Sequence, residues 1–320
     1  MILIFKKIWL KLLVFVAIVT AGQLIFFQHY NTLFATAQAE TKVTLQKLQK
    51  PKKRAIPVKT LIKQEVARLN AQYQFVQVSP NGQYATYLDK QNELHIEDLK
   101  SKKDVSHTTG LSTVQYVGWI SNQKLFVGEQ TSPGCLELIT VDEPDGAQTA
   151  VVPTFGQLSP GASFAKISFS RQTNDIYILI NTKTSSALYH IGTMAHVTAM
   201  PTDGRFIKDM DVSFTGDKLY FEDNVNFTDN VLYFDSNDEL HTVKLNAALI
   251  TVVGNVVYYG DVNKDGMVTD VYRMDENGDT TLVSTLDQPT SPSQIKITAD
   301  GKVENDASST TVGLMKASAN

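Results

Sequence analysis

The chain has 320 residues, of which 42% are hydrophobic and 19% are charged, with 29 Lys+Arg against 33 Asp+Glu. This composition excludes a mostly disordered polymer and is sufficient for a substantial buried core. The single cysteine, Cys135, excludes an intrachain disulfide, so stability must come from packing.

The first long apolar segment spans residues 8–27, IWLKLLVFVAIVTAGQLIFF. Twenty helical residues at 1.5 Å each span about 30 Å, the thickness of a bilayer's hydrocarbon core. Lys6, Lys7 and Lys11 lie at its start and no Lys or Arg follows until residue 42, so the positive-inside rule puts the N-terminus in the cytoplasm. We therefore predict that residues 1–30 form a cytoplasmic tip and a single transmembrane helix in the cell membrane, with the rest of the chain extracellular.

A cleaved signal peptide is the alternative for the same segment. Ala37-Gln38-Ala39 has the small-x-small pattern that signal peptidase accepts, and cleavage after Ala39 would give a secreted protein. About twelve residues separate Phe27 from this position, which is long for a cleavage region and favours the uncleaved anchor. A buried core helix would not explain the lysines beside the apolar run.

Residues 31–70 are predicted to form a basic stalk or linker. From Met1 to Asn70 there are 12 Lys+Arg against 2 Asp+Glu, a net charge of +10, while residues 71–320 carry 17 against 31, a net of −14. The run at residues 50–54, KPKKR, is either a solvated linker or a contact for anionic lipid headgroups or acidic wall polymers. Nucleic acid is excluded as a partner because the acidic remainder of the chain would repel phosphate.

The last part of this region, VKTLIKQEVARLNAQ at residues 58–72, places Leu61, Ile62, Val66 and Leu69 at helical spacing. This spacing predicts a short amphipathic helix packed on the domain that follows. A closing strand of that domain, formed by residues 55–58, is the alternative for its start.

Residues 71–320 contain a repeated pattern of short alternating strands joined by polar turns. In the first unit, FVQV ends at the turn Ser79-Pro80-Asn81-Gly82, QYATYL ends at a turn over residues 89–92, and ELHIEDL follows. The second strands of six such units are marked by Tyr84, Leu125, Ile176, Leu219, Val256 and Val303. Their spacings of 41, 51, 43, 37 and 47 residues match a four-stranded propeller blade.

The expected fold is therefore all-β, a β-propeller of six blades preceded by the transmembrane helix and the short helical stalk. Five or seven blades remain alternatives, because the interval of 51 residues can contain an insertion. A β-sandwich also has many short strands, but it would not repeat one strand-turn-strand phrase six times.

Four segments resemble the repeats of TolB-type, WD-repeat-like β-propellers: VSPNGQYATYL, VGWISNQKLFVGE, VSFTGDKLYFED and YYGDVNKDGMVTDVYRMDENG. The family repeat has an apolar or aromatic residue, Ser-Pro-Asp-Gly, a second strand, and an Asp-Ile-Tyr-like third strand that residues 270–275 match. Trp119, Phe169 and Phe214 match the aromatic position, and only the first unit keeps a near-complete Ser-Pro-Asn-Gly. The resemblance covers residues 73–316. It implies a fold that serves both as a scaffold for protein partners and beside the catalytic domain of prolyl-oligopeptidase-type peptidases, so it does not fix the function.

No catalytic residues are predicted. A Gly-x-Ser-x-Gly nucleophile elbow is absent from the sequence, and the six histidines form no pair at i, i+2 or i, i+4 spacing. We interpret His95 and His241 as structural residues at equivalent places in the third strands of their blades, and Cys135 as a free small residue in a loop. The three repeated aromatic residues are expected to pack between blades rather than to form a glycan platform.

One loop has the beginning of a calcium-binding pattern. Asp261, Asn263 and Asp265 supply oxygen ligands at positions 1, 3 and 5, and a turn glycine follows. An EF-hand would have Glu at the twelfth position, where Tyr272 stands, and the shorter loops of other propellers would have Asp at the ninth, where Thr269 stands. An ordinary hairpin and a calcium site both remain open, and no other cofactor is expected.

The sequence thus favours a non-catalytic binding or scaffold module at the cell surface, with a protein partner on the propeller loops. The net charge of −14 over residues 71–320 favours a basic partner. The alternative is a propeller hydrolase or lyase whose site is formed by loops of several blades.

Overall fold

The structure, a computed structural model, describes residues 58–142, 147–192 and 196–305. The apolar run at residues 8–27, the cleavage position after Ala39 and the basic run at residues 50–54 lie outside these ranges. Within the described ranges, no helix is long and apolar enough to cross a membrane. The described residues belong to one compact unit that begins at Val58.

Helix α2, Val58–Gln72, occupies the residues whose spacing predicts an amphipathic helix. Leu69 is fully buried, and Ile62 and Val66 pack with it against the first sheet. Glu65, on the same face, is also buried and forms ion pairs with Arg68 and Lys102. The helix is therefore packed on the β domain, as expected.

Five sheets of four antiparallel strands follow, and in each sheet every strand pairs with the next one in the chain. The strands of the first three sheets are β1 (Gln74–Val78), β2 (Tyr84–Leu88), β3 (Leu94–Asp98), β4 (Lys103–Thr108); β5 (Thr113–Trp119), β6 (Lys124–Ser132), β7 (Cys135–Asp142), β8 (Ala147–Phe155); β9 (Ser163–Phe169), β10 (Ile176–Asn181), β11 (Ser186–Ile191), β12 (Val197–Met200). Those of the next two are β13 (Phe206–Val212), β14 (Leu219–Val225), β15 (Thr228–Phe234), β16 (Leu240–Leu245); β17 (Ala247–Val253), β18 (Val256–Val262), β19 (Val268–Met274), β20 (Thr280–Thr290). A 3-10 turn, η1 (Pro292–Gln294), leads to a two-stranded sheet of β21 (Ile295–Ile297) and β22 (Val303–Asn305).

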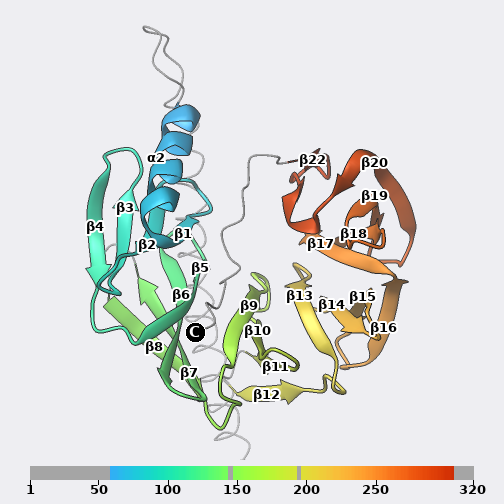
Figure 1. The fold of residues 1–320 in the computed structure, drawn as a ribbon, viewed down its shortest axis with the longest axis horizontal. Coiled ribbons are helices and arrows are strands. Elements are labelled where there is room, and N and C mark those ends of the chain that lie inside the picture. Colours follow the sequence, from blue (N-terminus) through green and yellow to red (C-terminus); the bar gives the residue numbers. More distant parts are fainter. Residues whose placement is uncertain (1–57, 143–146, 193–195, 306–320) are drawn as a thin grey trace, which may run out of the picture. The chain divides into compact units, whose positions relative to one another are not determined.

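Successive sheets contact each other through their first strands, β1 with β5, β5 with β9, β9 with β13, β13 with β17 and β17 with β21. The sheets follow one another in chain order, which the colours of Figure 1 trace. Such a succession of four-stranded meanders is the blade arrangement of a β-propeller. The predicted second-strand markers are confirmed, because five of them begin β2, β10, β14, β18 and β22 and Leu125 is the second residue of β6.

The core consists of apolar layers between neighbouring sheets. One layer joins Leu94 of the first sheet to Val117 of the second, and another joins Leu179 of the third to Phe221 of the fourth. Equivalent layers lie between the second and third, fourth and fifth, and fifth and last sheets. Each sheet is therefore stabilised mainly by burial of apolar surface against the next one.

The prediction that three aromatic residues pack between blades is correct for Trp119 and wrong for Phe214. Trp119 packs on the layer between the first and second sheets and donates its indole N–H to the carbonyl of Gln77 at 3.2 Å. Phe214 is 52% exposed. Phe214 does not occupy the position equivalent to Phe169. Phe169 is half-buried and is the last residue of β9, whereas Phe214 lies after Ser213 in the turn that follows β13.

Candidate functional site

Two hairpins share the pattern Asp, three residues, Glu-Leu-His. One runs from Asp89 to His95 between β2 and β3, and the other from Asp235 to His241 between β15 and β16. The expected equivalence of the two histidines is wrong, since β16 is the fourth strand of its sheet. Turns after second and third strands lie at opposite ends of an antiparallel sheet, so the two patterns occupy opposite ends of their blades.

The aspartate of each pattern holds its turn together. Asp89 Oδ1 accepts the backbone N–H groups of Gln91 and Glu93, both at 2.9 Å. Asp235 Oδ1 accepts the two equivalent N–H groups, also at 2.9 Å. A carboxylate that bonds to N–H groups ahead of it stabilises a tight turn, which explains why Asp stands at this position. The second oxygen, Oδ2, is left to contact the histidine.

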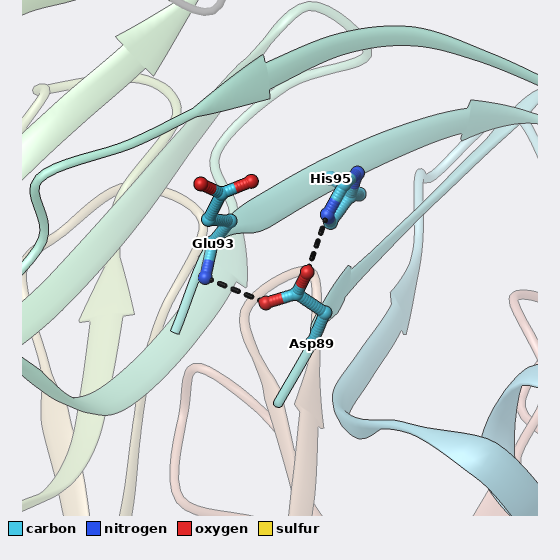
Figure 2. A group of neighbouring side chains, drawn as sticks. All are labelled: Asp89, Glu93 and His95. Atoms are coloured by element: carbon cyan, nitrogen blue, oxygen red, sulfur yellow. Dashed lines mark hydrogen bonds and ion pairs between the residues drawn. The ribbon is translucent and has the colours of Figure 1, made fainter. Parts of the chain in front are cut away.

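The imidazole of His95 lies between two carboxylates. Its Nε2 is 3.1 Å from Asp89 Oδ2, and its Nδ1 is 2.6 Å from Asp104 Oδ2 on β4. Figure 2 marks the contact between His95 and Asp89 with a dashed line. The ring stacks on Tyr87, directly across the sheet, with 5.1 Å between ring centroids. The carboxylate of Glu93 completes the group: Asp89, Glu93 and His95 each offer a ligand atom within 4.8 Å of the others.

Hydrogen bonds and burial act in opposite directions on these groups. Burial lowers the pKa of His95, but the bonds to Asp104 and Asp89 outweigh it, so the pKa is raised overall. Burial raises the pKa of Asp89, and the bonds from the Glu93 N–H, His95 and the Gln91 N–H together hold it below its usual value. Without another cation, the arrangement therefore favours an imidazolium between two carboxylates.

Asp89 and His95 of this group line a pocket of about 310 Å³. The pocket is lined by Tyr73, Tyr87, Asp89, Lys90, Gln91 and His95. A small ligand can therefore reach His95 and Asp89 from solvent, with the ammonium of Lys90 and the phenol rings beside it.

A tyrosine, a histidine and an aspartate recur together in two other sheets. Tyr233 stacks on His241, whose Nε2 is 3.1 Å from Asp235 Oδ2. Tyr177 stacks on His190, whose Nε2 is 3.0 Å from Asp175 Oδ1. The sequence search for pairs of histidines missed this element. The signal that could have found the His95 and His241 copies is the repeated Asp-x-x-x-Glu-Leu-His, with a tyrosine two residues before the aspartate.

The three residues of the predicted calcium loop lie at the β18–β19 hairpin. Asn263 Oδ1 accepts the N–H groups of Asp265 at 2.9 Å and of Met267 at 3.0 Å, the same turn that Asp89 forms. Asp261 Oδ1 is 3.4 Å from Lys244 Nζ, and Asp265 is exposed. Calcium binding here stays a prediction. An unfolding temperature that rises when calcium is added to chelator-treated protein would support it.

Comparison with known proteins finds no matching family model and no matching curated protein. Among solved structures, TolB from Acinetobacter baumannii is similar, with 15% identity, a TM-score of 0.45, and coverage of 71% of this chain and 55% of TolB. A prolyl endopeptidase has 15% identity and a TM-score of 0.50 over 70% of this chain and 36% of its own. The β-propeller domain of Cps50 (Swd1) from Myceliophteria thermophila has 12% identity and a TM-score of 0.44 over 68% and 74%.

At these identities the likeness shows a β-propeller fold and no function. The chain spans about half the length of TolB and about a third of the prolyl endopeptidase.

Proposed function

We propose that this protein is a single-pass membrane protein with a cytoplasmic N-terminus and an extracellular six-bladed propeller that binds a protein partner without catalysing a reaction. The anchor and the location rest on the apolar run at residues 8–27 and the lysines beside it. Six blades are supported by the five four-stranded sheets, the two-stranded sheet and the spacing of the repeats. Residues 31–70 would then include the stalk and the start of α2, with the propeller over residues 71–320.

The observation that carries the binding function is the full exposure of the Phe227 side chain. Its exposed fraction is 101%, and it lies at the tip of the hairpin between β14 and β15. Val225 pairs with Thr228, so Asn226 and Phe227 form a two-residue turn in which both φ angles are positive, at 54° and 62°. Such turns favour Asn followed by Gly, and a bulky side chain at positive φ is strained. Neither the turn nor the core needs Phe here, which supports a contact with a partner.

A second apolar side chain lies at the same end of the fourth sheet. Leu245, the last residue of β16, is 63% exposed and pairs with Asn230, close to the hairpin tip. Two exposed apolar side chains on an acidic domain fit a partner whose surface has an apolar contact bordered by basic residues. The charge of −14 over residues 71–320 would speed the encounter with such a partner at low salt.

The substitution Phe227→Gly tests this function. Glycine relieves the positive-φ strain, so we expect the free energy of unfolding to be unchanged or to rise by about 1 kcal/mol. Capture of the partner by the membrane form after crosslinking should fall several-fold. Leu282→Ser is the matched control, because Leu282 is also exposed, at 51%, but lies on the outer strand β20.

Full capture by a stable Phe227→Gly protein would contradict the assignment. A hydrolase and lyase screen of the same preparation tests the alternative. Turnover that one side-chain substitution abolishes would establish an enzyme instead.

A further inference from the structure

We infer that Asp89, Glu93 and His95 form a binding site for one divalent transition-metal ion with the ligand preferences of Zn²⁺. This site is separate from the partner contact at Phe227. It rests on the geometry of the β2–β3 hairpin and not on the proposed function.

The donor set and its spacing suit such an ion. Two carboxylates and an imidazole are common ligands of Zn²⁺ and related ions, whereas Ca²⁺ and Mg²⁺ prefer oxygen alone. Asp89 Oδ2 and His95 Nε2 are 3.1 Å apart. Two ligands with this separation, each about 2.1 Å from a metal, subtend about 95° there, between octahedral and tetrahedral geometry. The carboxylate of Glu93 lies within reach of the same position.

The surrounding residues fix the ligands in place. Asp104 accepts from Nδ1 of His95 at 2.6 Å, which directs Nε2 towards Asp89. A carboxylate on the second ring nitrogen is the usual support of a metal-bound histidine. The stacked ring of Tyr87 holds the imidazole from one side, and the turn fixes Asp89 through Oδ1. Little rearrangement is therefore needed for binding.

The charge balance also favours a dication. Three carboxylates, of Asp89, Glu93 and Asp104, lie around one imidazole, and the described part of the chain supplies no Lys or Arg ion pair to any of them. A dication bound among these carboxylates relieves their mutual repulsion.

Three protein ligands leave at least one coordination position open. The pocket of about 310 Å³ begins at Asp89 and His95 and also contains Lys90. Water or an anionic group of a ligand can therefore reach the bound ion.

The hairpin of Asp235, Glu239 and His241 provides a natural comparison. It offers the same three ligand types, but its histidine is 40% exposed against 17% for His95. Within the described residues no carboxylate is found at its Nδ1. We expect this second hairpin to bind the ion far more weakly.

The experiment is a calorimetric titration of the chelator-treated full chain with ZnCl₂, with Co²⁺ absorption as a second readout of ligation by nitrogen and oxygen. Wild type should bind one ion tightly. Glu93→Gln should weaken this event at least about 10-fold, and Asp104→Asn about 10- to 100-fold. Glu239→Gln, the matched control, should leave it unchanged.

A denaturant unfolding curve of each variant, recorded in the presence of chelator, first establishes that the variant is folded. Asp89→Asn gives a further test that spares the turn, because an amide oxygen holds the equivalent turn at Asn263. This variant should also lose the tight event. The inference is overturned if wild type binds no Zn²⁺, if Glu93→Gln binds it as tightly as wild type does, or if Glu239→Gln weakens it equally.

Discussion

Tyr177 illustrates how a buried side chain in this fold is tuned by its surroundings. It lies on β10, is 7% exposed, and stacks on His190 of β11 with 4.6 Å between ring centroids. Burial raises the pKa of its phenol to about 12, and the negative charges of Asp175, Asp238 and Asp217 add to this. The phenol therefore stays neutral in the folded protein where an unfolded chain would ionise it.

Tyr177 should accordingly make the protein less stable in alkali. The unfolded phenol ionises near pH 10 and the folded one near 12, so the stabilisation is complete below pH 10 and is lost as pH rises through 12. The two-unit difference corresponds to about 2–3 kcal/mol. Denaturant unfolding at pH 8 to 11 should show a smaller loss above pH 10 for Tyr177→Phe than for wild type. Parallel curves would contradict the assignment.

At the scale of single residues, the sequence predicts local chemistry well and cross-strand contacts poorly. The turns at Ser79 and Asn263 were predictable because their hydrogen bonds join residues close in sequence. The contact of His95 with Asp104 was not, since it depends on the register of β3 against β4. The prediction that Phe214 packs between blades was wrong for a related reason. A shift of one or two residues along the chain separates a packed strand position from an exposed turn.

Helix α2 is an integral element of the β domain rather than a free stalk. Its buried face combines apolar contacts with Glu65, whose bonds to Lys102 and Arg68 outweigh burial and lower its pKa. Arg68 also reaches Glu97 of β3 at 3.0 Å. The helix is thus attached to the first sheet by both packing and charge.

Truncation of Leu69 should reveal this attachment. Leu69 is fully buried, so Leu69→Ala should lower the free energy of unfolding by about 2–5 kcal/mol. Leu61, on the same helix, is 39% exposed. Leu61→Ala should therefore change the free energy of unfolding by less than about 0.5 kcal/mol. Denaturant midpoints of both variants provide the measurement. Equal effects would mean that the helix is not part of the cooperative unit.

At the scale of elements, inner strands were easier to predict than outer ones. Second strands such as β14 and β18 are largely buried on both faces, so they appear as continuous apolar runs bounded by turns. The outer strand β20 is mostly exposed and lacks alternation. His241 was expected in a third strand, but it lies on the outer strand β16, the fourth of its sheet.

In the whole molecule, polar contacts between first strands add to the apolar layers. Asp211 of β13 accepts from Ser168 of β9 at 3.1 Å and from Thr251 of β17 at 3.2 Å, so one carboxylate joins three sheets. Such links give a rigid frame on which loops can differ freely. The repeated strands were sufficient to predict the β-propeller fold. Phe227 and the His95 group lie in hairpins whose side chains the repeat does not specify.

We propose that this frame holds a partner outside the membrane through the end of the fourth sheet. The most direct measurement is photocrosslinking in intact cells, with a photoreactive side chain at position 227 and, as control, at position 282, both exposed in the structure. We predict an adduct of one defined mass at position 227, recovered with the membranes and removed by protease added outside the cells, and no such adduct at position 282. The absence of an adduct at 227, or equal adducts at both positions, would contradict the claim.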